Sequence, residues 1–211
     1  MATKGPLRPL VSLFRHPPAR QASRRTFFDG LLRSDKPLAI NVTRTIPYPR
    51  AQLYDLIVDV DSYAKFLPFC HHSRVTAWTS PNANNQRWPT EGELTVGYGP
   101  ITQSYTSRIV CVPGRSVEAL SGIDEPVAQK DGGKNPFKQL ITRWTVADAP
   151  APRTSNGEAQ QKEWTKVDLD MTMRLEDPFL QMMLSKVTDE TATKMIEAFE
   201  KQVRGQFGQG K

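Results

Sequence analysis

The sequence is poor in the residues that most often carry chemistry. Its 211 residues include only two cysteines and three histidines. Two cysteines are too few for a disulfide framework, so we expect both to be free thiols. His16 lies near the N-terminus and His71 and His72 are adjacent, which leaves acyl-transfer chemistry poorly supplied with a base. No stretch approaches the roughly 20 consecutive apolar residues of a membrane span, so we expect a soluble or peripheral protein.

The chain also lacks net charge beyond its first residues. Lysine and arginine number 28 against 22 acids, yet residues 1–34 hold seven of the bases and one acid. The remainder therefore has 21 residues of each sign. Because a neutral body has no general electrostatic attraction for polyphosphate, we expect no nucleic-acid partner.

The basic N-terminal segment has the composition of a targeting sequence. It is rich in arginine, nearly free of acids, and spaces apolar residues from Leu7 to Phe14 along one helical face, which is typical of a mitochondrial transit peptide. A disordered basic arm is the alternative, because several prolines would interrupt that helix. We expect a transit peptide or disordered tail over 1–34, a folded domain over 35–207 and a disordered C-terminus over 208–211.

Alternating apolar and polar residues predict strands along most of the domain. The clearest run covers 163–175, where one face is apolar and the other is largely charged. Helical spacing predicts a short helix over 50–58, and a second from Asp61, as its N-cap, to Phe66. The expected strands are 38–46, 70–79, 91–98, 101–112, 115–121, 137–147 and 163–175.

One long amphipathic helix is predicted after Pro178. Apolar residues recur at helical spacing from Leu180 to Ala198, and we expect the helix to end near Gly205. The order of one strand, two short helices, six strands and a long helix predicts an α+β fold. In this fold a curved antiparallel sheet of six to seven strands grips the last helix, and a cavity remains wherever side chains leave the enclosed space unfilled.

Four ordered blocks resemble a known family. The likeness runs from about residue 38 to 204, and the chain departs from the family pattern by carrying Phe69 where tryptophan is common and by having three longer loops. The blocks are "YDLIVDVDSYAKFLPFC" (54–70), "GELTVGYGPITQSYTSRI" (92–109), "NPFKQLITRW" (135–144) and "PFLQMMLSKVTDETATKMIEAFEKQ" (178–202). They are similar to mitochondrial coenzyme Q-binding proteins of the START-like (polyketide cyclase/lipid transport) superfamily.

The resemblance implies a helix-grip START-like fold around an apolar cavity that binds ubiquinone or another polyprenyl quinone. It implies no catalytic residues and no cofactor other than the bound quinone. It also implies a carrier that supports respiratory electron transport and ubiquinone biosynthesis, located peripherally on the matrix side of the mitochondrial inner membrane. The implied partners are the inner-membrane lipid surface and respiratory-chain complexes or the quinone biosynthesis assembly.

The expected ligand-binding residues come from the "FLPF" motif, the strand ending at Trp144 and the long helix. Unbranched methionines suit a flexible tail, and "FLPF" suits an apolar lip that touches lipid. Plain core packing is the alternative for each of these residues. We also expect the segment before Pro178 to act as a hinge. The predicted set is Phe66, Leu67, Pro68, Phe69, Trp144, Leu180, Met183, Leu184, Val187 and Met195.

A metal site is not expected, although Cys70, His71 and His72 all have ligand side chains. Three consecutive residues rarely converge on one ion, and no second cysteine or histidine pair stands at metal-binding spacing.

Two other functions remain open at the level of sequence. A START-like cyclase or hydrolase acting on a hydrophobic substrate would need acid/base groups, for which Tyr54, Asp55, Asp59 and His71 are the candidates, at no spacing that pairs them. A protein-assembly or co-chaperone module would use the outer face of the sheet and need no cavity.

Overall fold

The computed structural model describes residues 36–98, 101–123, 135–151, 163–186 and 188–208. Within these ranges, seven antiparallel strands form one sheet in the order β1-β7-β6-β5-β4-β3-β2. The elements in chain order are β1 (Leu38–Ile46), α2 (Arg50–Val58), the 3-10 helix η1 (Val60–Ser62), α3 (Tyr63–Phe66), β2 (Cys70–Trp78), β3 (Pro89–Tyr98), β4 (Ile101–Val112), β5 (Ser116–Ser121), β6 (Phe137–Ala149), β7 (Trp164–Leu175), α4 (Pro178–Ser185) and α5 (Thr188–Phe207).

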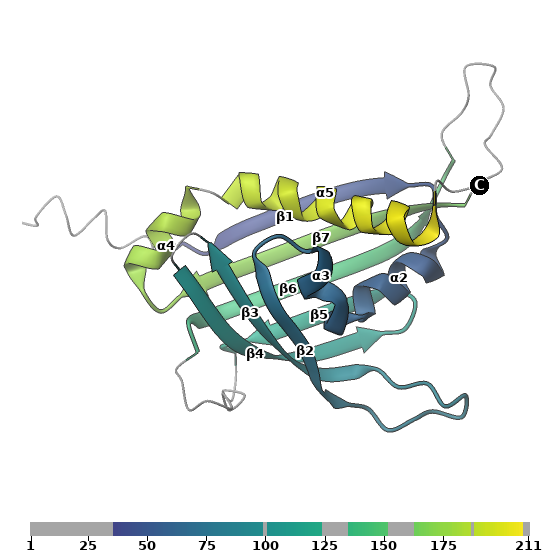
Figure 1. Cartoon of the computed structure of the whole chain (residues 1–211), viewed down its shortest axis with the longest axis horizontal. Helices are drawn as coiled ribbons and strands as arrows, with labels where there is room; N and C mark the ends of the chain where they lie inside the picture. The colour runs from purple at the N-terminus through teal and green to yellow at the C-terminus, as the bar shows by residue number, and fades with distance from the viewer. Residues whose placement is uncertain (1–35, 99–100, 124–134, 152–162, 187, 209–211) are drawn as a thin grey trace, which may run out of the picture.

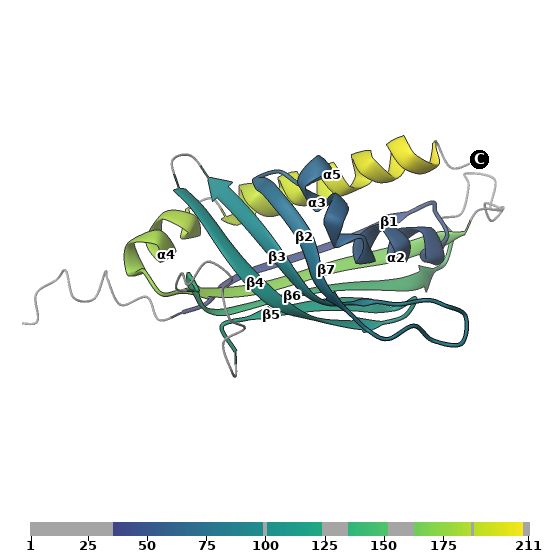
Figure 2. The ribbon, with the colours of Figure 1, turned by 60° about the horizontal axis from the view of Figure 1, so that its bottom comes forward.

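The sheet is strongly curved, and α5 lies along its concave side (Figures 1 and 2). In both views β2, β3 and β4 cross steeply over the direction of β1, β7 and β6, while α4 and α2 lie toward opposite ends of the molecule. This is the fold predicted from the sequence, a curved sheet gripping a C-terminal helix.

The strands form where side-chain polarity alternates, because a sheet with one buried face selects that pattern. In β7, Val167 and Leu169 are fully buried, whereas the intervening Asp168 faces outward and accepts a 2.6 Å hydrogen bond from the Thr43 hydroxyl of β1. Every predicted strand lies within two residues of its observed bounds, and the predicted helix over 50–58 matches α2.

The predicted capping role of Asp61 is wrong. No side chain caps α3, and Asp61 lies one turn earlier, in η1. Its carboxylate accepts a 2.6 Å hydrogen bond from the backbone N–H of Val75 in β2. Because β2 is an edge strand, this bond supplies an acceptor that no further strand provides, and it fastens the short helices to the sheet.

The predicted single C-terminal helix is divided into α4 and α5. Pro178 begins α4, and the Asp177 carboxylate caps it by accepting a 2.8 Å bond from the Phe179 N–H. In α5 the most deeply buried residues are Ile196, Phe199 and Val203, one position away from the predicted stripe. The prediction assumed one continuous helix, with its apolar residues on a single face. The break between α4 and α5 shifts which residues of α5 face the core.

Buried apolar side chains gather in two clusters, which we call the packed end and the hollow end. The packed end joins α2, the second half of α5 and the sheet, and includes Leu53, Leu169 and Phe199. The hollow end lies toward α4, and its buried members among the described residues are Tyr105, Phe137, Leu140 and Leu175. No helix in the described part of the chain is long and apolar enough to cross a membrane.

Candidate functional site

A cavity of about 220 Å³ lies between the concave face of the sheet and the helices α3, α4 and α5. Strands β3 to β7 form its floor, with inward side chains such as Leu94, Ile109 and Met173. Most lining residues are apolar, and none of the described lining residues is charged or a histidine. The described lining of the cavity is therefore mostly apolar and uncharged.

Seven of the ten predicted ligand-binding residues line this cavity: Leu67, Pro68, Phe69, Trp144, Leu180, Leu184 and Met195. Phe66 does not line it, and packs edge-on against Tyr63 with ring centroids 5.9 Å apart. Met183 is 40% exposed on the outer face of α4, because the phase of that helix turns Leu180 and Leu184 inward. Val187 lies outside the described residues.

Apart from Trp144 of β6, the sequence prediction missed the residues of the cavity floor. Tyr105 and Met171 are lining residues from β4 and β7, and Leu140 comes from β6 between them. The alternation in 163–175 correctly put Met171 and Met173 on the apolar face. That pattern was a usable signal, but alternation alone does not distinguish a packed face from one that borders empty space.

Phe69 holds the end of the "FLPF" motif in an unusual backbone conformation. Its φ of 66° is in the left-handed region, which phenylalanine rarely adopts. Its carbonyl accepts a 2.8 Å hydrogen bond from the Gly97 N–H in β3, and its ring lies 5.8 Å from Lys194 Nζ in α5. The motif is therefore fixed between the sheet and α5 at the rim of the cavity.

A buried glutamine fixes α4 to the sheet. Gln181 is 6% exposed; its Oε1 accepts a 2.9 Å bond from the Leu175 N–H, and its Nε2 donates a 2.9 Å bond to the Lys36 carbonyl. Hinge motion before Pro178, which stays a prediction, would have to break both bonds.

The polar groups near the cavity are held in their neutral forms. Burial raises the pKa of the Tyr63 and Tyr105 hydroxyls, and the Tyr63 hydroxyl donates to the Ile57 carbonyl. Burial also raises the pKa of the Cys70 thiol, and it raises that of Cys111, beside Tyr54, to about 11. Their raised pKa values make these four side chains poor bases and nucleophiles near neutral pH.

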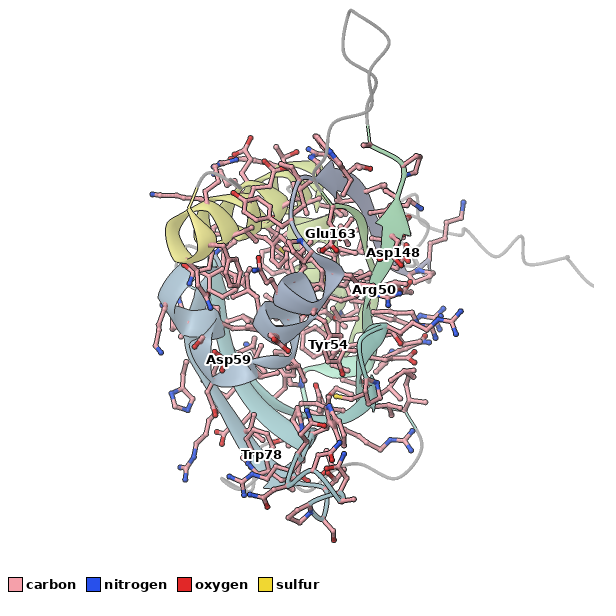
Figure 3. All side chains as sticks on the ribbon, turned by 90° about the vertical axis from the view of Figure 1, so that its right-hand side faces the viewer. Arg50, Tyr54, Asp59, Trp78, Asp148 and Glu163 are labelled. Carbon is pink, nitrogen blue, oxygen red and sulfur yellow. The ribbon has the colours of Figure 1, made fainter. Side chains whose placement is uncertain are left out.

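The candidate acid/base residues do not converge on the cavity. Asp55, Asp59 and His71 are exposed, Tyr54 is buried beneath α2, and none of the four lines the cavity. Figure 3 shows Tyr54 on α2 pointing toward the sheet and Asp59 at the end of that helix. Arg50, at the start of α2, pairs with Asp148 at 3.3 Å.

No group of three or more histidine, cysteine or acidic side chains within the described ranges is placed to hold a metal ion. His71 and His72 are exposed, and the Cys70 thiol donates a 3.4 Å bond to the His72 carbonyl, while Cys70 also lines the cavity. The three consecutive ligand-type side chains are therefore not gathered at one point.

A curved antiparallel sheet that grips a C-terminal helix over an apolar cavity defines the START-like class. A START superfamily protein from Mycobacterium smegmatis shares this fold, with a TM-score of 0.56 and 12% identity, covering 79% of this chain and 97% of its own. The chain belongs to the polyketide cyclase/dehydrase and lipid transport family, whose sequence profile matches residues 46–200. The superfamily and the fold predicted from the sequence are thus confirmed.

Two relatives illustrate the range of this family. The chain is 26% identical to the mitochondrial coenzyme Q-binding protein coq10 of Schizosaccharomyces pombe, over 77% of this chain and 84% of the relative. It is 28% identical to the ribosome association toxin RatA of Pseudomonas aeruginosa, over 77% of this chain and 93% of the relative. Since the two names describe different activities, the function has to be argued from the cavity.

Proposed function

We propose that this protein binds ubiquinone or a related polyprenyl quinone in its cavity and carries it without changing it chemically. The observation that supports this most strongly is the lining, which is mostly apolar and has no charged residue among those described. Each buried CH₂-sized group of an isoprenoid contributes about 0.8 kcal/mol, so an apolar lining is what a quinone leaving a bilayer requires. The name of the Schizosaccharomyces pombe relative supports the same ligand class.

The size of the cavity limits how much of the quinone it holds. A volume of about 220 Å³ is below the roughly 300–1,000 Å³ of pockets that enclose drug-sized ligands. We propose that the quinone ring and the first part of the tail occupy the cavity. The remaining isoprene units then extend outward between the "FLPF" motif and α4, into lipid or along the protein surface.

A carrier is favoured over the two alternatives. A cyclase or hydrolase needs an acid or base beside its substrate, and Asp55, Asp59 and His71 are exposed away from the cavity. Ribosome association, which the Pseudomonas aeruginosa relative's name suggests, would draw on positive charge. Beyond residue 34, however, the chain has 21 bases and 21 acids.

Native purification, lipid extraction and mass spectrometry test the proposal directly. Wild-type protein is expected to carry quinone, and Ala119→Leu, which places three added carbons in the cavity, is expected to lose at least 90% of it while remaining folded. Ala147→Leu is the matched control, because Ala147 is exposed on β6 outside the lining. Co-sedimentation with ribosomes and no bound quinone would overturn the proposal.

We also propose a mitochondrial location, peripheral on the matrix side of the inner membrane, and a role in respiration and ubiquinone biosynthesis. The basic segment 1–34 and the mitochondrial naming of coq10 support this. Residues 1–34 fused to a fluorescent protein should direct it into mitochondria and be cleaved on import. Retention of the fusion in the cytosol would contradict the location.

The outer face of α4 is the surface that we propose rests on the membrane. Phe179 and Met183 are 56% and 40% exposed there, while Leu180 and Leu184 of the same helix line the cavity. A bilayer covering that face would therefore lie next to the cavity, which shortens the path of a quinone between them. The sequence predicted this contact for "FLPF", but residues 66–69 are only partly exposed.

Vesicle flotation tests this surface. The double variant Phe179→Ser and Met183→Ser should reduce binding to phosphatidylcholine vesicles containing cardiolipin at least fivefold. It removes both exposed apolar side chains that we expect to enter the lipid. The matched control is Val110→Ser with Val112→Ser, which changes side chains of similar exposure, 42% and 46%, on β4. Equal losses in the two double variants would contradict a specific role for α4.

A further inference from the structure

Ser107 is an unexplained polar group at the inner part of the cavity. It is 2% exposed, it lines the cavity, and its Oγ is buried with no hydrogen-bond partner among the described residues. Buried hydroxyl groups nearly always have a partner, because a lost hydrogen bond to water otherwise goes uncompensated. A group of this kind, placed on a cavity wall, points to something that the cavity is built to receive.

The position of Ser107 explains why no neighbour satisfies it. On β4 it lies between Tyr105 and Ile109, which share its concave face. The residue paired with it on the neighbouring strand β3 is Gly92, which has no side chain that could bond to the hydroxyl. On the other side, Ser121 already donates to the Thr106 carbonyl at 2.9 Å and accepts from Asn135 at 2.7 Å. The hydroxyl is therefore left for a ligand.

The position of Ser107 on β4 also shows where along the cavity its hydroxyl lies. Ile109 belongs to the packed end and Tyr105 to the hollow end, so Ser107 lies where the cavity meets the packed interior. Space above Gly92 is already filled, because a Cβ there would meet Ile109 Cδ1 at 3.0 Å and Val60 Cγ1 at 3.6 Å. A ligand group that reaches Ser107 is thus on the side of the cavity that borders the packed end and away from α4.

We infer that the Ser107 hydroxyl donates a hydrogen bond to a carbonyl oxygen on the ring of the bound ligand, and so orients the ring inward and the tail toward α4. This inference rests on the proposed function. A quinone ring has carbonyl acceptors and no donor, which matches the unpaired Ser107 hydroxyl in a wall that is mostly apolar. A hydrocarbon chain could not make this bond, so Ser107 selects for the ring over the tail.

Ser107→Ala separates this role from packing. In the ligand-free protein the change removes an unpaired polar group, so the melting temperature should stay the same or rise. Affinity for decylubiquinone, followed by quenching of tryptophan fluorescence, should fall about 3- to 10-fold, the loss expected for one net hydrogen bond. Affinity for squalene, a hydrocarbon without carbonyls, should not change, and Ser107→Thr should retain quinone binding.

Ser121→Ala is the matched control, since it also removes a buried serine hydroxyl from the sheet, but one that has partners and does not line the cavity. It should lower the melting temperature and leave quinone affinity unchanged. Infrared spectra of bound quinone with ¹³C-labelled carbonyls provide a second readout. One carbonyl stretch should be lowered in wild-type protein, and the lowering should be absent in Ser107→Ala.

These measurements can contradict the role of Ser107 separately from the carrier function. An unchanged carbonyl stretch, or equal loss of quinone and squalene binding in Ser107→Ala, would overturn the inference and leave a buried water as the partner of Ser107. In that case quinone binding by wild-type protein would still support the carrier function. If wild-type protein bound no quinone at all, both the carrier function and the role of Ser107 would be wrong.

Discussion

The two halves of α5 face different interiors. From Ile196 onward, Ile196, Phe199 and Val203 are at most 1% exposed and pack into the larger cluster. In its first half, Thr191 and Met195 border the cavity. One continuous helix therefore serves a closely packed interior at one end and an open space at the other, which indicates that stability and ligand binding are divided along its length.

The division has a physical reason. A side chain in a filled interior has partner atoms on every side, whereas one that borders a void lacks them on the open side. Removing atoms from the packed end should therefore cost more stability than removing them from the hollow end. Changes at the hollow end should act mainly on ligand affinity.

The largest effect is expected from Phe199→Ala. Phe199 is 1% exposed, and its ring centroid lies 5.2 Å from that of Trp144. The change should lower the free energy of unfolding by about 3–5 kcal/mol, measured by urea denaturation. A loss below about 1 kcal/mol would mean that this end is not the well-packed one.

Gln181→Ala should have the next largest effect. It leaves the Leu175 N–H and the Lys36 carbonyl without their partner, at a cost of about 2 kcal/mol. Hydrogen exchange should accelerate in α4 while the second half of α5 stays protected. The control is Gln206→Ala, at an exposed position of α5, which should change neither. Unchanged exchange in α4 would contradict the idea that Gln181 restrains it.

Leu184→Ala tests the hollow end, as Phe199→Ala tests the packed end. Leu184 is partly buried and lines the cavity, so we expect a stability loss of only about 1 kcal/mol, well below that of Phe199→Ala. Quinone affinity should fall in addition, because apolar contact with the ligand is lost. If instead the two variants lost equal stability, the distinction between the ends would fail.

The smallest effects concern the two thiols. Because burial raises the pKa of Cys111 to about 11 and also raises that of Cys70, both should react slowly with iodoacetamide at pH 7.5. Their raised pKa favours folding at neutral pH. That contribution should be lost as pH rises above about 9, where the thiols of the unfolded chain ionise first. Rapid labelling of folded protein at pH 7.5 would contradict this.

The sequence predicted the elements better than the site. Alternation in 163–175 and helical spacing in 50–58 gave the bounds of β7 and α2 within one residue, since both depend on local periodicity. Leu67 and Trp144 were placed at the cavity through family resemblance. Met183 was misplaced because its facing depends on the phase of α4 alone, which the interruption before α5 separates from the longer pattern.

The sequence by itself determined which residues are strands, which face of each strand is apolar and where the positive charge is concentrated, because each of these follows from neighbouring residues. Only the tertiary structure decided that the apolar faces leave about 220 Å³ unfilled and that the Ser107 hydroxyl borders this space with no hydrogen-bond partner in the described part of the chain. A void is what remains after residues from six strands, three α-helices and one 3-10 helix are packed together. The volume left unfilled depends on all of these residues together, so no local sequence pattern predicts it.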